Sequence, residues 1–309
     1  MNNIWLFIWT KRWYNVLKNV FENNYNISWV LILIQPIKEN NVYHDKIISF
    51  CKKNNIHYET SKNIKTSQYT NFISENKIDT LFCVSWRFLI NENCFNIPKN
   101  WIFVIHDSLL PKYRWFAPTN WVIINWENKT GLTLQKISKE CDAWEILDQI
   151  EFNINDWDDA KIINDKLIKL YPQIILNNID KIQNWDYKTI IQNEESATYT
   201  CKRIFEDWKI DFNKDINTIS NLIRWLTWPY YWAYCYLENE LIYIWEVEKI
   251  YKNYVWIIPW RVIEFYDNWV WVLCWDWNII KIKKISKKGN KTLFEKPNKL
   301  LNSIKLTLK

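Results

Sequence analysis

One segment of the chain, residues 106–114, carries the residue types of a catalytic loop. It reads His-Asp-Ser-Leu-Leu-Pro-Lys-Tyr-Arg and directly follows the apolar run Ile102–Ile105. A histidine just past a buried strand can act as a general base, because imidazole gains and loses a proton near neutral pH. The planar guanidinium of Arg114 suits a phosphate or a carboxylate. The segment therefore predicts proton transfer at His106 next to an anion site.

A second segment, residues 140–146, could supply a carboxylate to such a histidine. It reads Glu-Cys-Asp-Ala-Trp-Glu-Ile, which is acidic and typical of a turn if glycine stands at position 144. Taken alone, the segment is equally typical of a solvated loop.

The first half of the chain predicts an α/β domain that would position these segments. Tyr14–Glu22 and Asp45–Lys53 have helical spacing and alternate with short apolar runs that are typical of buried strands. The runs are Ile4–Ile8, Val30–Ile34, Thr80–Val84 and Ile102–Ile105. Such alternation predicts a Rossmann-like parallel sheet with both faces covered. Ligands bind these sheets at the carboxyl ends of strands, where Ser85–Arg87 and His106–Arg114 follow.

The second half predicts helices, a linker and a small β domain. Asp158–Leu176 and Ile216–Leu226 have helical spacing, and the polar stretch 192–200 separates them. After residue 233, short β-rich runs between turn signals predict a small OB-like barrel. The runs are Leu241–Ile244, Arg261–Phe265, Val270–Cys274 and Ile279–Ile282. The predicted parts are a catalytic domain at 1–190, a linker at 191–206 and a C-terminal barrel at 207–309.

The composition excludes several classes of protein. Of 309 residues, 49% are hydrophobic and 24% are charged, so the chain is neither disordered nor embedded in a membrane. The seven cysteines form no CxxC pair, which is typical of idle thiols in a reducing compartment. The net charge of +6 permits anionic partners but does not by itself indicate a nucleic-acid binder. We expect a cytoplasmic protein with no membrane partner and no metal site.

The counts of glycine and tryptophan are both abnormal. A chain of this length usually holds about 22 glycines, whereas this one has 2, together with 23 tryptophans. Several tryptophans stand where a turn favours glycine, as in Asp267-Asn268-Trp269 between two apolar runs. We hypothesise that most tryptophans are glycine in the natural protein, because its source reads a codon, UGA in this hypothesis, as glycine. The alternative is a chain that is truly rich in tryptophan.

Taken together, the motifs resemble those of the formyltetrahydrofolate-dependent formyltransferases, which act on methionyl-tRNA or on nucleotide sugars. In order, the matching motifs are His106-x-Ser-Leu-Leu-Pro-x-Tyr-Arg, Ala117-Pro118, Thr130-Gly131-Leu132-Thr133 and Asp142-Ala143-Trp144-Glu145-Ile146. Asp142 lies 36 residues after His106, as the family pattern requires. The pattern has glycine at Trp115 and Trp144, which agrees with the recoding hypothesis. The resemblance continues through the linker and the C-terminal barrel.

The resemblance implies transfer of a formyl group from 10-formyltetrahydrofolate to a primary amine. His106 matches the catalytic histidine, and Asp142 matches the carboxylate that favours its protonated form. Val104 is a departure, because the family has an asparagine there whose amide stabilises the oxyanion. Losing such a donor costs about 100- to 1,000-fold in rate. Either another donor substitutes, with Asn120 as the candidate, or activity is reduced, or the acceptor chemistry differs.

The resemblance also implies a folate site and no metal ion. The folate would lie against the backbone after the third strand, the loop after the fourth strand and the loop that leads to Asp142. The matching positions are Phe88, Leu89, Ile90, Ser108, Leu109, Leu110, Pro111, Arg114, Ser138, Lys139, Glu140, Cys141 and Asp142.

The acceptor amine is the least determined part of this interpretation. Arg87 and the stretch Asn120–Asn125 are similar to enzymes that formylate UDP-4-amino-4-deoxy-L-arabinose. The tRNA enzymes carry a basic insertion after the second strand, whereas Gln35–Asp45 holds Lys38 as its only lysine or arginine. The complete barrel and the basic isoelectric point suit tRNA. We rank a nucleotide-linked 4-amino sugar first and initiator methionyl-tRNA second.

A third alternative is a non-catalytic binder of folate or nucleotide sugar that kept the fold. Val104 motivates it, because valine cannot donate a hydrogen bond. Turnover of 10-formyltetrahydrofolate with any amine would exclude this alternative.

Overall fold

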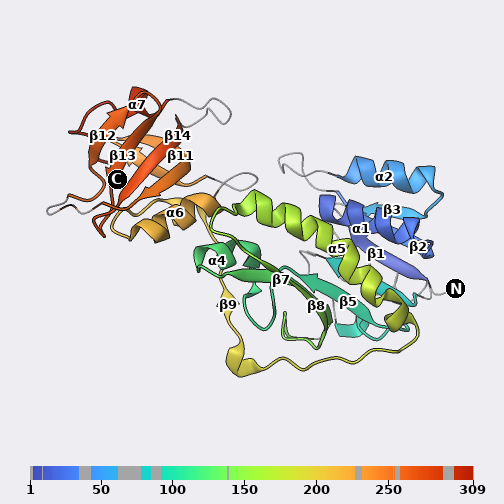
Figure 1. Ribbon diagram of the computed structural model, residues 1–309. Helices are drawn as coiled ribbons and strands as arrows, with labels where there is room; N and C mark the ends of the chain where they lie inside the picture. Colours follow the sequence, from blue (N-terminus) through green and yellow to red (C-terminus); the bar gives the residue numbers. More distant parts are fainter. Residues whose placement is uncertain are drawn as a thin grey trace. The chain divides into compact units, whose positions relative to one another are not determined.

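The computed structural model describes most of the chain, in two compact units (Figure 1). The described residues are 3–8, 10–34, 43–61, 78–84, 92–137, 139–226, 232–252, 254, 258–287 and 296–308. The first unit comprises Met1–Thr119, Lys129–Asn153 and Asn164–Cys201. The second comprises Asn120–Asn128, Ile154–Ile163 and Lys202–Lys309. Within the described residues, every helix is too short or too polar to cross a membrane.

A seven-stranded sheet in the order β3-β2-β1-β4-β5-β7-β8 forms the centre of the first unit. Its strands are β1 (Ile4–Ile8), β2 (Ile27–Leu33), β3 (Tyr58–Ser61), β4 (Thr80–Val84), β5 (Ile102–His106), β7 (Lys129–Lys136) and β8 (Ile146–Asn153). The first five strands in this order, β3-β2-β1-β4-β5, are parallel to one another. This arrangement confirms the predicted α/β fold. The strands β7 and β8, which the apolar runs did not predict, extend the sheet in the antiparallel sense.

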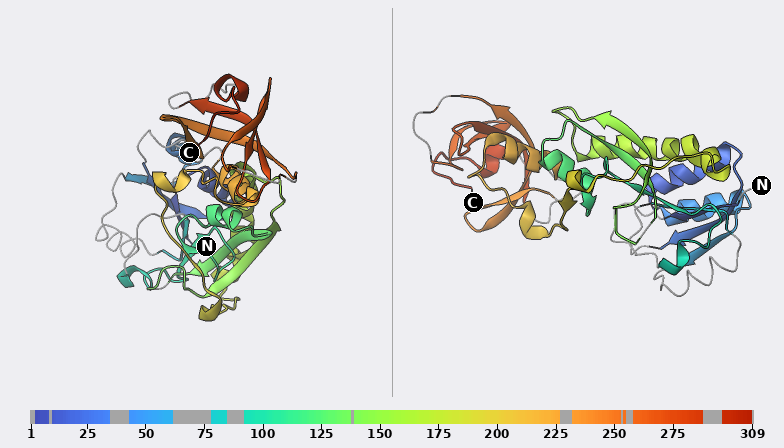
Figure 2. Two further views of the ribbon diagram at one scale, coloured as in Figure 1. Left: turned by 90° about the vertical axis from the view of Figure 1, so that its left-hand side faces the viewer. Right: turned by 90° about the horizontal axis from the view of Figure 1, so that it is seen from below.

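Helices cover the sheet where the sequence has helical spacing, and Figure 2 gives two further views of them. They are α1 (Lys11–Glu22), α2 (His44–Lys53) and α5 (Ala160–Gln183). Their positions confirm the three helices predicted for this part of the chain. On α1 the buried side chains are Trp13, Val16, Leu17 and Val20, which form one helical face.

A five-stranded antiparallel sheet in the order β10-β11-β14-β13-β12 forms the second unit. Its strands are β10 (Tyr234–Leu237), β11 (Glu240–Ile250), β12 (Val262–Tyr266), β13 (Trp269–Leu273) and β14 (Ile279–Lys287). Thr307 bridges Arg261, which precedes β12, and Leu308 bridges Leu237 in β10. The last residues thereby join the two edges of the sheet, as a small barrel requires. Helix α6 (Ile216–Trp225) packs against β11.

Short elements complete the fold. They are η1 (Glu92–Cys94), β6 (Arg114–Trp115), α4 (Pro118–Ile124), η2 (Glu194–Ser196), β9 (Tyr199–Thr200), η3 (Phe205–Trp208) and α7 (Pro297–Leu300). The strands β6 and β9 pair in parallel and form a separate two-stranded sheet.

Tryptophan is concentrated where the backbone adopts positive φ. Six of the twelve non-glycine residues with positive φ in the described part of the chain are tryptophans. They are Trp101 (82°), Trp115 (83°), Trp126 (61°), Trp185 (59°), Trp260 (58°) and Trp277 (67°). Trp126 and Trp185 follow the ends of α4 and α5, where the hydrogen bonds form the Schellman motif that favours glycine. Asn24 and Asn55 occupy the same position after α1 and α2, and asparagine tolerates this conformation.

Candidate functional site

The structure brings His106 and Asp142 together at the carboxyl end of β5. His106 is the last residue of that strand, and its side chain is 8% exposed. The imidazole Nδ1 lies 3.4 Å from Asp142 Oδ1. The imidazole Nε2 lies 2.9 Å from the backbone carbonyl oxygen of Tyr113. The pairing expected from the sequence motifs is therefore present in the fold.

Both ring nitrogens of His106 face oxygen acceptors. A neutral imidazole carries one N–H donor, whereas the protonated ring carries two. Uptake of a proton therefore satisfies the Asp142 carboxylate and the Tyr113 carbonyl at the same time. The arrangement suits a base that accepts a proton during the reaction.

The loop of Asp142 holds its carboxylate with donors from two other segments. Asp142 itself has φ of 58°, in the left-handed region. Its Oδ2 accepts a hydrogen bond from the backbone N–H of Trp115 at 2.9 Å. Its Oδ1 accepts a longer one, of 3.3 Å, from Gln135 Nε2 in β7. The carboxylate is thus fixed from the β6 side and from the sheet.

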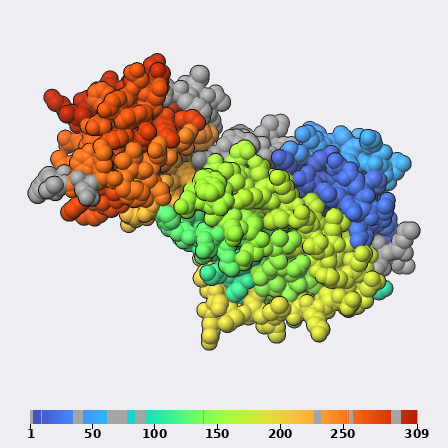
Figure 3. Space-filling model, viewed as in Figure 1, coloured from blue at the N-terminus to red at the C-terminus, as the bar shows by residue number. Residues whose placement is uncertain are grey.

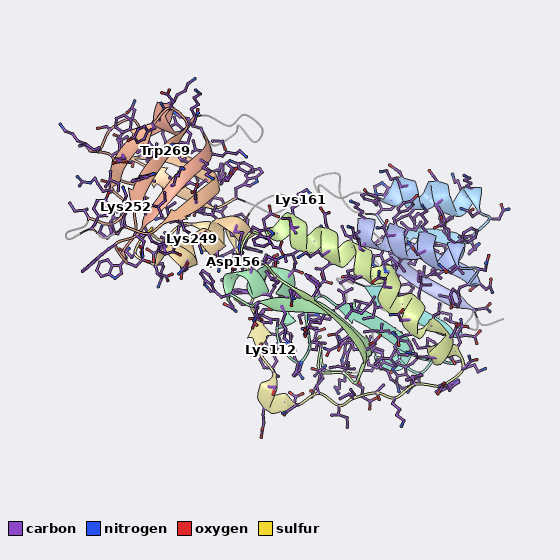
Figure 4. All side chains as sticks on the ribbon, in the orientation of Figure 1. Lys112, Asp156, Lys161, Lys249, Lys252 and Trp269 are labelled. Carbon is purple, nitrogen blue, oxygen red and sulfur yellow. The ribbon has the colours of Figure 1, made fainter. Side chains whose placement is uncertain are left out.

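Side chains of β7 and β8 hold the loop that follows His106. Thr133 Oγ1 donates to the carbonyl of Ser108 at 2.6 Å and accepts from the N–H of Leu110 at 3.1 Å. Gln149 Nε2 donates to the carbonyl of Leu110 at 2.9 Å. The sequence motifs include Thr133 without indicating its role and do not include Gln149, because both residues lie in strands that the apolar runs do not predict. Lys112, labelled in Figure 4, belongs to the same loop and accepts a bond from Ser108 Oγ at its carbonyl.

Gly131 makes room for this loop. A Cβ atom at this position would lie 2.0 Å from the carbonyl oxygen of Ile150 and 2.8 Å from Leu109 Cδ2. The first clash is with backbone of the paired strand β8, so it cannot be relieved by a rotamer change. Leu109 therefore packs over a glycine by necessity.

We expect Gly131→Ala to destabilise the fold by about 1–3 kcal/mol or more, because overpacking forces backbone shifts. Urea unfolding followed by fluorescence measures the change. Thr130→Val on the same strand is the control: the buried Thr130 Oγ1 has no hydrogen-bond partner in the described structure, so its loss costs little. Equal midpoints for both variants would contradict the packing argument.

The structure assigns all five N–H donors of Arg114 to protein oxygens. Nε and Nη2 donate to Gln192 Oε1 at 3.2 and 2.9 Å. Nη2 and Nη1 also donate to the Glu194 carboxylate at 2.6 and 2.8 Å, and Nη1 reaches the Tyr199 hydroxyl at 3.2 Å. Hydrogen bonding to Glu194 raises the pKa of Arg114 above its ordinary value. Arg114 is 1% exposed, and its guanidinium holds the chain that follows α5 in place. Because all five donors are used, none is left for a ligand anion.

Asp107 points away from the imidazole into a separate polar cluster. Its carboxylate accepts hydrogen bonds from Arg12 Nη1 and from the Tyr171 hydroxyl. Arg12 Nη2 also donates to Asn164 Oδ1 at 2.6 Å. The cluster ties the start of α1 and helix α5 to the residue that follows His106.

The remaining predicted folate positions are only partly described. Phe88, Leu89, Ile90 and Ser138 lie outside the described residues, as does Arg87. Leu110 is buried, whereas Lys139, Glu140 and Cys141 are exposed beside Asp142. Lys139 Nζ lies 3.3 Å from Glu92 Oε1. No three His, Cys, Asp or Glu side chains within the described ranges gather as metal ligands.

Val104 lies two residues before His106 on β5, so both side chains project from the same face of the sheet. Val104 is half-buried and packs against a cluster of apolar residues. The candidate substitute donor, Asn120, lies in α4; the residue is buried, and its Oδ1 has no hydrogen-bond partner in the described part of the chain.

Two family models match the chain. The model described as formyl transferase matches residues 21–179, which is half of the chain. The model described as formyl transferase, C-terminal domain, matches residues 205–302.

Two curated relatives are similar in sequence. The bifunctional polymyxin resistance protein ArnA of Wigglesworthia glossinidia brevipalpis is 36% identical over 201 residues, which cover 62% of this chain and 30% of that protein. The chain thus spans about a third of the length of this relative. The methionyl-tRNA formyltransferase of Bacteroides thetaiotaomicron is 29% identical over 249 residues, which cover 76% of each protein.

Two solved structures share the fold over almost the whole chain. WlaRD, a sugar 3N-formyl transferase, has a TM-score of 0.69 and 22% identity, and the match covers 94% of this chain and 98% of that one. An N-formyltransferase from Helicobacter canadensis has a TM-score of 0.71 and 20% identity, with 92% and 99% covered.

Proposed function

The chain belongs to the formyl transferase family, and from this premise we propose that it moves a formyl group from 10-formyltetrahydrofolate to a primary amine. The observation that carries the proposal is the His106–Asp142 pair at the carboxyl end of a parallel strand. Site residues of this kind supply a proton acceptor and a countercharge, which formyl transfer to an amine requires.

In the proposed reaction, the neutral amine attacks the formyl carbon and a tetrahedral intermediate forms. The amine proton passes to His106, whose Nε2 exchanges the Tyr113 carbonyl for the substrate. The Asp142 carboxylate stabilises the protonated ring. The ring then gives a proton to the folate nitrogen as the carbon–nitrogen bond breaks, which leaves a formamide and tetrahydrofolate.

We propose a nucleotide-linked 4-amino sugar as the acceptor. Two solved N-formyltransferases support a nucleotide-linked amino sugar: one is a sugar 3N-formyl transferase described in the presence of dTDP, and the other is in complex with dTDP-3-aminofucose. The 4-position of the amine rests on the resemblance of Arg87 and Asn120–Asn125 to the enzymes that formylate UDP-4-amino-4-deoxy-L-arabinose. The same two structures contain 5-N-formyl-tetrahydrofolate and folinic acid, which supports a formylated folate as the donor.

Ion pairing in the barrel also favours a small acceptor over tRNA. The lysines of β14 lie beside glutamates of β11 rather than forming an unpaired basic surface. The pairs are Lys281 and Lys283 with Glu248, Lys284 with Glu246, and Lys287 with Glu240, at 2.5–3.3 Å. Phosphate binding would have to compete with these carboxylates.

Methionyl-tRNA is the second candidate acceptor, because the relative that covers 76% of this chain is a methionyl-tRNA formyltransferase. The barrel also presents cations beside aromatic rings, such as Lys252 over Trp271 at 4.3 Å and Lys281 over Trp269 at 5.1 Å. Lys252 and Trp269 are labelled in Figure 4.

The test compares both acceptors with 10-formyltetrahydrofolate at two salt concentrations. We expect formylation of a UDP- or dTDP-linked 4-amino sugar with a shallow salt dependence, and little or none of methionyl-tRNA. Many phosphate contacts would instead make tRNA binding fall steeply with salt. Efficient, salt-sensitive formylation of methionyl-tRNA, with the amino sugars inert, would reverse the ranking.

We further propose that residues 1–190 carry the chemistry, that 191–206 link it to the barrel at 207–309, and that the protein works in the cytoplasm. The family models, which end at 179 and begin again at 205, support these bounds. All seven cysteines are free, which supports a reducing compartment.

We also propose that glycine stands at most tryptophan positions in the natural protein. The six tryptophans at positive φ support this, because L-residues with bulky side chains are strained there. Trp144 adds to the argument: its indole Nε1 is buried without a hydrogen-bond partner in the described structure.

A further inference from the structure

Gln192 uses every hydrogen-bonding capacity of its amide. The residue is 6% exposed. Its Nε2 donates to the carbonyl of Asp142 at 2.9 Å and to the carbonyl of Trp144 at 2.7 Å. Its Oε1 accepts from Arg114 Nε and Nη2 at 3.2 and 2.9 Å. Nε2 also makes a longer contact, of 3.5 Å, with Gln135 Oε1. Both N–H donors and both acceptor sites are thereby engaged, and the two shortest bonds from Nε2 go to the loop of Asp142.

Gln192 begins a stretch of nine residues, 192–200, here named the tether segment. After α5 the chain runs along the edge of the unit to β9 (Figure 1). Figure 3 shows atoms of this part of the chain at the surface. The tether segment also bonds the loop on the other side of the imidazole. Thr198 Oγ1 accepts from the N–H of Tyr113 at 2.9 Å, and the Thr198 carbonyl accepts from the N–H of Arg114 at 2.9 Å.

The tether segment therefore touches both acceptors of His106. Tyr113, whose carbonyl faces Nε2, is held by Thr198. Asp142, whose carboxylate faces Nδ1, is held through its own carbonyl by Gln192. One short piece of chain thus contacts both residues whose oxygen atoms face the imidazole.

We propose that Gln192 is a positioning residue that sets the Asp142 carboxylate against His106. The proposal rests on the proposed formyl transfer for its kinetic consequence. Asp142 has φ of 58°, in the left-handed region that L-residues seldom adopt, so contacts around the loop must hold it there. By bonding the carbonyls of Asp142 and Trp144, the amide fixes the loop on both sides of Ala143.

A glutamate has the shape of Gln192 and keeps an acceptor for Arg114, but it has no donor for the two carbonyls. Gln192→Glu therefore removes the loop contacts while it preserves the tether contact. We expect the variant to lower kcat by about 10- to 100-fold, since small misplacements of a catalytic group have effects of that size. KM for 10-formyltetrahydrofolate should stay within about twofold of wild type, because the amide of Gln192 is buried and already bonded to protein groups.

The matched control is Thr189→Val. Thr189, three residues before the tether segment, donates from Oγ1 to Glu145 Oε2 at 2.8 Å, three residues after Asp142. It thus joins the neighbouring stretches of chain without a hydrogen bond to Asp142. We expect wild-type kcat for this variant. An equal loss in both variants would show a general loosening and overturn the proposal.

A double-mutant cycle with Asp142→Asn tests whether Gln192 acts through Asp142. If it does, Gln192→Glu has little further effect in the Asp142→Asn background, whereas an independent structural defect adds its full cost. Full additivity therefore overturns the proposal. Gln192→Ala gives the same comparison should the glutamate variant fail to fold.

A spectroscopic readout separates this proposal from the proposed activity. The ring ¹H–¹³C signal of His106, assigned by its loss in His106→Ala, should shift in Gln192→Glu and stay in place in Thr189→Val. This measurement needs no substrate, so it remains valid if no tested amine is formylated. An unshifted His106 signal in Gln192→Glu would overturn the positioning role.

Discussion

Alanine at position 106 is expected to lower formyl transfer by about 100- to 10,000-fold, the usual contribution of a general base. Nδ1 and Nε2 of His106 are placed by Asp142 and by the Tyr113 carbonyl, and no other imidazole lies in either of the two loops that hold it. Asp142→Asn should cost at least about 100-fold, because the amide keeps the shape but removes the charge that stabilises the protonated ring.

Steady-state kinetics with 10-formyltetrahydrofolate and the amino sugar measure both losses. The controls are His57→Ala and Asp186→Asn, which change exposed residues of the same types away from the site. Circular dichroism and urea unfolding should show the wild-type fold in all four variants, since His106 and Asp142 lie at a strand end and in a loop. Rates near wild type in His106→Ala would remove the base from the mechanism.

The sheet could be predicted from the sequence only where its strands are apolar. The runs that form β1, β2, β4 and β5 are almost continuously hydrophobic, as strands buried on both faces must be. In β7 the buried residues include Thr130, Thr133 and Gln135. These polar side chains interrupt the apolar pattern, so the strand could not be predicted from it. Two of them, Thr133 and Gln135, form hydrogen bonds with the loops of the candidate site.

The pairing of His106 with Asp142 required more than periodicity. β7 runs antiparallel to β5, so its end at Lys136 lies beside Phe103, at the far end of β5 from His106. The loop that follows must return along the sheet to reach the imidazole. The 36-residue spacing in the family pattern indicates that Asp142 reaches His106, whereas local helix and strand propensities do not.

Arg114 shows where motif reading fails. A guanidinium in a catalytic loop suggests an anion site, but its partners Gln192 and Glu194 lie 78 and 80 residues further along the chain. They stand in a stretch that reads only as a polar linker. A single sequence contains no local pattern that indicates such long-range polar contacts. The fold is therefore needed to show that Arg114 holds the chain at Gln192 and Glu194.

Replacing the six tryptophans at positive φ by glycine is expected to raise the free energy of unfolding strongly. The expected gain is comparable to the total free energy of unfolding of a typical domain. Each L-residue in the left-handed region costs about 1–2 kcal/mol, and distant sites add nearly independently. Six positions therefore amount to about 6–12 kcal/mol, against the 5–15 kcal/mol by which native proteins are usually stable. The chain with tryptophan at these positions should be poorly soluble, and the glycine variant should fold.

The six changes are Trp101→Gly, Trp115→Gly, Trp126→Gly, Trp185→Gly, Trp260→Gly and Trp277→Gly. Soluble yield and urea unfolding compare this variant with the unchanged chain. The matched control is Asn24→Gly with Asn55→Gly, which alters the same helix-end position at residues that already tolerate it. That pair should gain far less per site, because asparagine visits the left-handed region at little cost.

The site itself should respond most strongly to Trp115. Its backbone N–H bonds Asp142 Oδ2 at 2.9 Å while φ is 83°, so the strained residue is one of those that hold the Asp142 carboxylate. Its exposed indole lies against Tyr199, with ring centroids 4.6 Å apart. Glycine keeps the N–H donor to Asp142 and relieves the strain, so the variant should also bind folate more tightly. Either of two results ends the recoding proposal. One is a tryptophan chain that is soluble, unfolds cooperatively and is as active as the glycine variant. The other is an intact mass of the natural protein that matches 23 tryptophans.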